Sequence, residues 1–239
     1  MSHLVLVRHG QASFLEKDYD RLSPKGERQG LLLGEYWARH KIIFEHVYSG
    51  PKLRQRHTAR LAGEAYRDAG LPWPETELLP EFDEFQAEAV IDRTLPGLIE
   101  NDERIRCLHR EFQAATTRPA QFKTFQRLFE VVIGRWAAGE LPLEGIEPWP
   151  DFVARVRGAI RKLTGNGARG RRIAIFTSGG PMAVAMQYAL ELSTPATLKT
   201  AWMVRNCAFS EFLFTPERFT LSFYNATPHL TDPELLTHR

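Results

Sequence analysis

Four apolar residues, Leu4 to Val7, run directly into the tripeptide Arg8-His9-Gly10. A run this short is too short for a helix and is typical of a buried parallel strand. The arginine and the histidine therefore stand where the first strand ends, and Gly10 allows a sharp turn and a close approach of the backbone to a ligand. In open α/β sheets, ligands bind at this end of the strands.

Arg8 and His9 together can carry out chemistry on a phosphate ester. A histidine beside a fixed cation can attack phosphorus while the guanidinium holds the phosphoryl oxygens. Taken alone, the tripeptide is better explained as a solvated basic pair in a turn. The rest of the chain favours the interpretation that Arg8 and His9 act on a phosphate ester.

Composition limits the partners. The 239 residues suffice for one sizeable core, or a core with a smaller appendage, and the net charge of +2 is too small to indicate nucleic acid or a membrane surface. Residues 83–150 carry a net charge of −4 and the remainder +6, which fits an anionic small molecule bound by the main body. We expect no nucleic-acid and no membrane partner, and the oligomeric state cannot be derived.

Two further features concern the compartment. Cys107 and Cys207 are a hundred residues apart and have no Cys-x-x-Cys spacing, so we expect free thiols in a reducing compartment. The apolar run at residues 4–7 is too short for a signal peptide, and no apolar stretch approaches the length of a membrane span. Both features favour a cytoplasmic protein.

The chain alternates strand and helix patterns. We expect strands at residues 4–7, 46–49, 77–79, 172–177, 208–214 and 219–225, and helices at residues 24–40, 53–68 and from Gly179 to about Leu192. This alternation predicts a mostly parallel sheet covered by helices on both faces, and the short turn at residues 215–217 predicts that the last two strands are antiparallel.

Residues 83–150 do not follow this alternation. They are helical in composition and are interrupted by prolines, among them those at positions 96, 119, 142 and 148. We interpret them as an α-helical insertion that lies over the strand ends, with residues 1–82 and 151–239 forming the α/β core. Its aromatic residues would suit an organic group, but they could equally form the insertion's own core: Phe82, Phe85, Phe122 and Trp149.

Two more side chains follow predicted strands at the same edge. Arg54 comes just after residues 46–49, at the start of a helix whose N–H groups favour an anion. Glu81 comes just after residues 77–79, where a carboxyl group can protonate a leaving oxygen and later deprotonate water. Asp83 and Glu84 compete with Glu81 for this role, and Glu81 is nearest to the predicted strand end.

Together these segments resemble the histidine phosphatase superfamily, the phosphoglycerate-mutase-like proteins. The resemblance rests on residues 6–10, on residues 22–29, on residues 49–59 around Arg54, on residues 79–81, and on residues 206–208 and 225–230. It implies a three-layer αβα sandwich with a mostly parallel sheet, an antiparallel edge strand and an α-helical cap insertion. It also implies that the protein has no metal or organic cofactor.

Carried over to this chain, the resemblance assigns His9 as the nucleophile that becomes phosphohistidine and Glu81 as the proton donor. Arg8 and Arg54 would bind the phosphoryl oxygens. The chain departs from the family at His57, where glutamine is usual, and at Ser178, where a second histidine normally completes the phosphate pocket. The N–H groups of the helix that Gly179 opens offer a partial substitute for that histidine, while His57, one turn after Arg54, is more simply a structural histidine.

Three functions remain compatible with this pattern. The first is a phosphomonoester hydrolase that acts on a small phosphorylated molecule, with activity that Ser178 weakens because a hydroxyl group brings no charge. The second is a regulatory protein that binds a phosphate ester with a weak or inactive site. The third is a phosphoglycerate-mutase-type phosphotransferase, which ranks below hydrolysis because that branch of the family keeps the second histidine.

Overall fold

The computed structural model describes residues 1–13, 20–165 and 170–238 and divides the chain into two compact units. Residues 1–84 and 155–239 form the first unit, and residues 85–154 form the second. None of the helices in the described ranges is long and apolar enough to cross a membrane. Cys107 and Cys207 are both free, as the sequence predicted.

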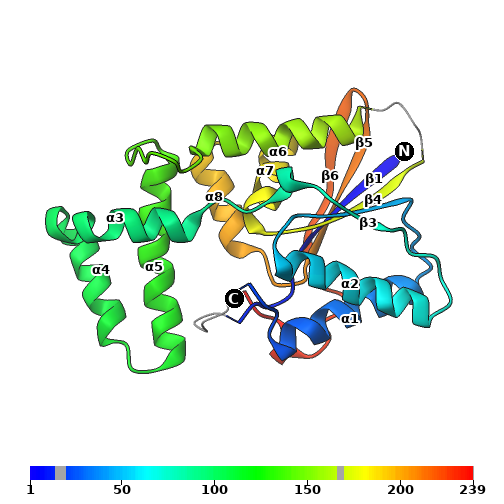
Figure 1. The fold of residues 1–239 in the computed structure, drawn as a ribbon, viewed down its shortest axis with the longest axis horizontal. Helices are drawn as coiled ribbons and strands as arrows, with labels where there is room; N and C mark the ends of the chain where they lie inside the picture. Colours follow the sequence, from blue (N-terminus) through cyan, green and yellow to red (C-terminus); the bar gives the residue numbers. More distant parts are fainter. Residues whose placement is uncertain (14–19, 166–169, 239) are drawn as a thin grey trace. The chain divides into compact units, whose positions relative to one another are not determined.

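The first unit is built on a six-stranded sheet with the order β3-β2-β4-β1-β5-β6 (Figure 1). β1, β2, β3 and β4 pair in parallel, whereas β5 runs antiparallel to both of its neighbours, β1 and β6. The predicted, mostly parallel sheet with antiparallel pairing at its edge is confirmed. The strands are β1 (Ser2–Arg8), β2 (His46–Ser49), β3 (Thr76–Leu78), β4 (Arg172–Thr177), β5 (Phe209–Thr215) and β6 (Arg218–Ala226).

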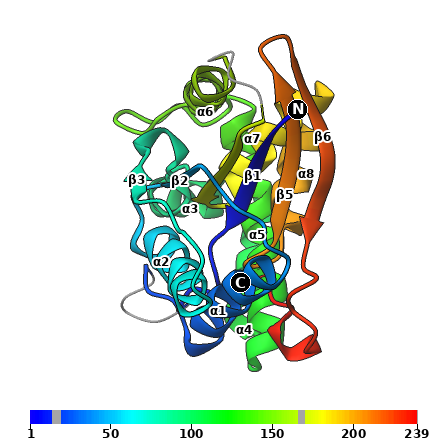
Figure 2. The same cartoon turned by 90° about the vertical axis from the view of Figure 1, so that its right-hand side faces the viewer.

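Helices cover the sheet on both faces. α1 (Pro24–Arg39) and α2 (Leu53–Asp68) pack on one face, and α6 (Trp149–Thr164), α7 (Gly179–Leu190) and α8 (Thr194–Met203) lie on the other (Figure 2). Successive side chains of a strand point to opposite faces. Val5 and Val7 accordingly join the core beneath α1 and α2, while Leu4 and Leu6 are buried on the other face. The run at residues 4–7 is continuously apolar because both of its faces are covered, and the three-layer prediction is confirmed.

The second unit is helical, with α3 (Ala87–Asn101), α4 (Glu103–Ala114) and α5 (Arg118–Ala137). One expectation was wrong here. Pro96 lies inside α3 and does not interrupt it, since the helix tolerates the loss of one backbone hydrogen bond. The aromatic residues of this unit form its core: the rings of Phe85 and Trp136 stack with centroids 5.3 Å apart, and Phe152 meets Phe85 at 5.6 Å.

The carboxyl ends of the parallel strands lie at one edge of the sheet. Arg8 of β1 lies opposite Thr177 of β4, and Ser49 of β2 lies opposite Phe176. The ladder continues by one residue beyond the strands, because the N–H of His9 donates to the carbonyl of Thr177 at 2.9 Å and that of Gly50 donates to Phe176 at 2.9 Å. The segments after β1, β2 and β4 therefore leave the sheet side by side.

Candidate active site

His9 is held rigidly at the end of β1. Its side chain is buried, with a relative exposure of 3%, and its backbone carbonyl accepts a hydrogen bond from the N–H of Cys207 at 3.1 Å. The next residue, Gly10, donates its N–H to Oγ1 of Thr58 at 3.0 Å. A Cβ atom at Gly10 would lie 2.4 Å from the carbonyl oxygen of Gly26. The turn after the strand therefore requires glycine, as the sequence predicted.

The hydrogen bonds of the His9 ring define its tautomer. Nδ1 lies 2.7 Å from the carbonyl oxygen of Gly10. A carbonyl oxygen can only accept, so Nδ1 carries the proton. Nε2 accepts a hydrogen bond from Nε of Arg54 at 3.1 Å. Nε2 consequently carries a lone pair, which is the state that a nucleophilic nitrogen needs.

The electrostatic surroundings keep this ring neutral. Burial lowers the pKa of His9 well below its usual value of 6.5, and the positive charges of Arg54 and Arg8 lower it further. The hydrogen bond to Gly10 acts in the opposite direction but does not outweigh them. At neutral pH the imidazole is therefore available as a base and nucleophile between two cations.

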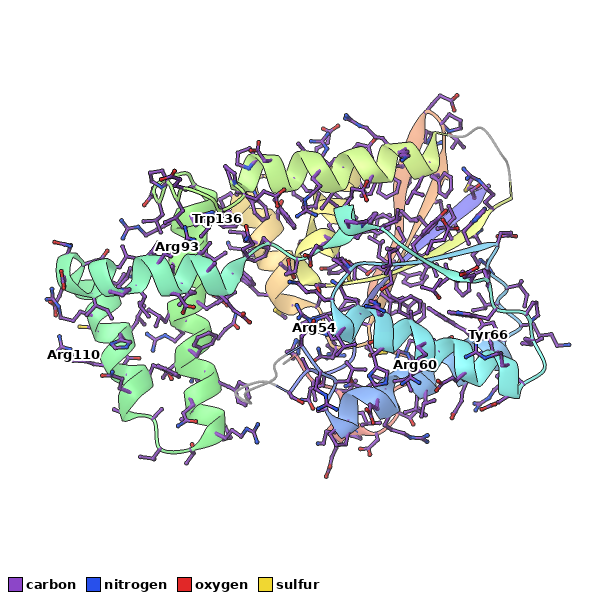
Figure 3. All side chains as sticks on the ribbon, viewed as in Figure 1. Arg54, Arg60, Tyr66, Arg93, Arg110 and Trp136 are labelled. Atoms are coloured by element: carbon purple, nitrogen blue, oxygen red, sulfur yellow. The ribbon has the colours of Figure 1, made fainter. Side chains whose placement is uncertain are left out.

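Arg54 occupies the first turn of α2, where Figure 3 shows it at the beginning of the helix. The residue is 7% exposed, and its Nη1 lies 2.7 Å from Oδ1 of Asp20. The other oxygen of Asp20 accepts the N–H of Leu53 at 2.8 Å. Asp20 thus satisfies a free N–H group at the helix start and neutralises Arg54 at the same time.

Arg8, the last residue of β1, lies close enough to His9 for its charge to act on the ring. Its Nη1 donates to the carbonyl oxygen of Val204, the residue that follows α8. Arg8 also contributes to the lowered pKa of His9. The structure therefore brings together three of the residues that the sequence singled out: Arg8, His9 and Arg54.

Ser178 follows β4 and is 1% exposed. Its Oγ accepts a hydrogen bond from Nε2 of Gln55 at 2.8 Å, and Oε1 of Gln55 accepts the N–H of Lys52 at 3.1 Å. A Cβ atom at Gly50 would lie 2.3 Å from that same amide oxygen. A buried glutamine from α2 therefore packs against the serine, in space that the glycine after β2 leaves open.

The first turn of α7 already holds an anion from the chain itself. The N–H of Gly180 donates to a carboxylate oxygen of Glu84 at 3.0 Å. Gly179, the residue predicted to bind substrate through its N–H group, is buried beside it. The attraction of this helix start for negative charge, expected from the sequence, is here directed at Glu84.

Glu81 lies in the short 3-10 turn Pro80–Phe82, directly after β3. The turn is fixed from α6, because Nη1 of Arg155 donates to the backbone carbonyl of Glu81 at 2.7 Å and approaches those of Pro80 and Asp83 at 3.4 Å. Within the described ranges, no hydrogen bond joins the Glu81 carboxylate to His9. Its role as the acid stays a prediction.

His57 takes part in a different cluster. Its Nε2 lies 2.7 Å from Nη2 of Arg60 and 4.0 Å from a carboxylate oxygen of Glu27. Burial and the charge of Arg60 lower the pKa of His57. This environment agrees with the structural interpretation of His57 and does not bring the ring to His9.

Comparison with known proteins identifies the family. A model of the histidine phosphatase superfamily (branch 1) matches residues 4–128 and 110–227. The chain belongs to the histidine phosphatase superfamily. A 2,3-bisphosphoglycerate-dependent phosphoglycerate mutase of Pelagibacter ubique (strain HTCC1062) is 37% identical over 79 residues, which are 30% of this chain and 33% of the mutase. The alignment thus spans about a third of the length of that relative.

Solved structures of histidine phosphatase-like proteins share the fold. The phosphoglycerate mutase of Bacillus anthracis superposes with a TM-score of 0.64 at 17% identity, covering 96% of this chain and 95% of the mutase. The mycobacterial glucosyl-3-phosphoglycerate phosphatase superposes with a TM-score of 0.60 at 20% identity, covering 94% and 99%. Both phosphatases and mutases are therefore built on this architecture, and the fold does not separate the two activities.

Two residues that contact this histidine phosphatase site were missed at the sequence level. Asp20 hydrogen-bonds to Arg54 and Gln55 to Ser178, whereas Glu84, considered from the sequence only as an acid, binds the N–H of Gly180. Asp20 is 34 positions before Arg54, and Gln55 is 123 positions before Ser178. No periodicity or motif connects residues so far apart, so only the folded arrangement reveals these contacts.

Proposed function

We propose that the chain is a metal-independent phosphomonoester hydrolase. Its substrate is a small phosphorylated molecule, and the phosphoryl group is transferred to Nε2 of His9. The observation that carries the proposal is the state of the His9 ring. Nδ1 is bound to the Gly10 carbonyl, and Nε2 presents its lone pair beside the guanidinium of Arg54. Membership in a superfamily that contains phosphatases and mutases supports the same chemistry.

In the first step, Nε2 attacks phosphorus and the ester oxygen leaves. Arg54 turns its N–H donors from Nε2 to the phosphoryl oxygens, and the positive charge of Arg8 helps to balance the charge of these oxygens. Nδ1 keeps its proton and donates it to the Gly10 carbonyl, and this hydrogen bond stabilises the positive charge that develops on the ring when the N–P bond forms. The leaving oxygen takes a proton from a carboxylic acid and departs as an alcohol.

In the second step, the same carboxylate takes a proton from water while the water oxygen attacks the phosphohistidine. The N–P bond breaks, its electron pair returns to Nε2, and inorganic phosphate leaves. The ring regains its starting tautomer because Nδ1 has kept its proton throughout. One acid–base group therefore serves both halves of the reaction.

Glu81 is the best candidate for this acid–base group. Asp83 lies 3.7 Å from Nζ of Lys52, and Glu84 accepts the N–H of Gly180. Both of those carboxylates are therefore engaged by structural partners. The Glu81 side chain is half-buried on a turn whose backbone Arg155 fixes, and this turn follows β3 at the edge of the sheet where His9 also lies.

The proposal is tested by turnover of a generic aryl phosphate. The wild-type chain should release phosphate, and His9→Gln should abolish release, whereas the same change at His109 in the second unit should leave it intact. Tight phosphate binding without turnover would favour the regulatory protein instead. Transfer of the phosphoryl group to a second acceptor, with no free phosphate, would favour the phosphotransferase.

A further inference from the structure

The C-terminal segment, residues 231–238, folds back along α1 (Figures 1 and 2). Nε2 of Gln29, a fully buried residue of α1, donates to the carbonyl of Leu235 at 2.7 Å and to Oγ1 of Thr237 at 3.0 Å. At the exposed end of the same segment, Nζ of Lys25 donates to the carbonyl of Glu234 at 3.2 Å. The segment is therefore attached through the buried Gln29 and through the exposed Lys25.

Thr237 hydrogen-bonds to two buried side-chain amides, those of Gln29 and Asn206. Its hydroxyl donates to Oδ1 of Asn206 at 2.9 Å while it accepts from Gln29. Its backbone carbonyl accepts the N–H of Asn206 at 2.8 Å. Gln29 and Asn206 are both buried, with exposures of 0% and 1%. Leaving such amides unsatisfied is costly, so the hydroxyl of Thr237 matters to both of them.

The same two amides also hold the loop that carries the nucleophile. Oε1 of Gln29 accepts the N–H of Gln11 at 2.7 Å. Nδ2 of Asn206 donates to the carbonyl of His9 at 3.5 Å. The same carbonyl also accepts the N–H of Cys207, the residue after Asn206. Each amide thus has one end on the His9–Gln11 loop and the other on Thr237.

His238, the residue after Thr237, shows that the segment reaches the candidate site itself. Val204, whose carbonyl accepts from Arg8, also interacts through its backbone with the ring of His238. Partial burial lowers the pKa of His238, and the charges of Arg8 and Arg205 lower it further. The segment therefore ends beside one of the two arginines that flank His9.

We propose that Thr237 is a positioning residue of the active site: its hydroxyl locks Gln29 and Asn206, and these fix the His9–Gln11 loop so that Nε2 of His9 is aligned for attack. This inference rests on the proposed function. The hydroxyl acts through two buried amides and touches no substrate, so its loss should impair the phosphorylation step more than substrate binding.

The test compares two near-isosteric variants with a matched control. Thr237→Val keeps the shape but removes both hydroxyl bonds, Thr237→Ser keeps the hydroxyl, and Lys25→Ala removes only the exposed contact of the same segment. With an aryl phosphate, kcat should fall about 10- to 100-fold in Thr237→Val at nearly unchanged KM, since a small displacement of reacting atoms costs this much. Thr237→Ser and Lys25→Ala should remain within about threefold of wild type.

A second readout does not depend on turnover. In ¹⁵N-histidine NMR spectra, assigned with His9→Gln, the His9 resonances of Thr237→Val should report a pKa closer to 6.5, because a loosened loop admits water to the ring. An unchanged His9 pKa together with an unchanged kcat, even with a lowered melting temperature, would overturn the proposal. If the wild type turns over no ester, the proposed function fails while the NMR comparison still decides whether Thr237 positions His9.

Discussion

Nε of Arg54 donates to Nε2 of His9 across 3.1 Å, although the two residues are 45 positions apart in the chain. The contact forms because β1 and β2 both pair in parallel with β4, so that their carboxyl ends meet at one edge of the sheet. It directs the lone pair of His9 Nε2 toward a guanidinium group that can bind phosphoryl oxygens.

Substitution of Arg54 should weaken the binding of inorganic phosphate as well as turnover. A hydrogen bond to a charged group is worth roughly 1.5–3 kcal/mol, so Arg54→Ala should raise the inhibition constant of phosphate by about one to two decades. Arg54→Lys should restore only part of this loss, because lysine lacks the planar fork that contacts His9 and Asp20 together. Phosphate inhibition equal to wild type in Arg54→Ala would remove Arg54 from the site.

Glu81→Gln should distinguish esters by their leaving groups. Alkyl phosphates need a proton on the departing oxygen, whereas activated aryl phosphates need little, so kcat/KM should fall far more for the alkyl esters. The matched control is Asp83→Asn, which should affect both classes equally and slightly. An equal loss on both classes in Glu81→Gln would assign the acid to another carboxyl group.

Ser178→His tests whether the usual histidine can be restored. Ser178 is buried and its hydroxyl receives the Gln55 amide at 2.8 Å, so an imidazole would collide with Gln55 and should cost about 1–3 kcal/mol of stability as well as activity. Gln55→Ala combined with Ser178→His removes the obstacle and should regain both. A single Ser178→His variant that is stable and faster than wild type would show that the pocket has room for histidine.

The lowered pKa of His9 predicts a pH dependence of stability. The unfolded histidine protonates near pH 6.5, whereas folded His9 resists protonation, so stability is full above 6.5 and falls as the pH drops toward the folded pKa. Urea unfolding at pH 7.5 and 5.0 should show that the wild type loses more stability than His9→Gln, by up to about 2 kcal/mol over this range. Equal losses in the two proteins would mean that folded His9 protonates normally.

The sequence predicted those elements whose patterns lie within a short stretch of the chain. The buried strand at residues 172–177 and the helix at residues 53–68 are marked by their own apolar patterns, and the structure has them with those bounds. The parallel strands predicted that His9 and Arg54 lie at the same edge of the sheet, but the sequence did not predict that β4 lies between β1 and β2.

The polar contacts around that pair could not be predicted in the same way. Asp20, Gln55 and Thr237 are ordinary polar residues in sequence, and each reaches its partner only after helices and loops have packed. The tolerance of α3 for Pro96 is similarly a property of the packed helix and not of the local pattern. Hydrogen bonds between side chains far apart in the chain therefore could not be predicted from this sequence alone.

The central claim is tested most directly by trapping the covalent intermediate. The enzyme is mixed with an aryl phosphate, quenched in alkali so that an N–P bond survives, and analysed by mass spectrometry and ³¹P NMR. The account predicts phosphate on His9, bound through Nε2, with the label absent in His9→Gln. Continuing turnover with phosphate on another residue, or with no phosphorylated protein at all, would contradict it.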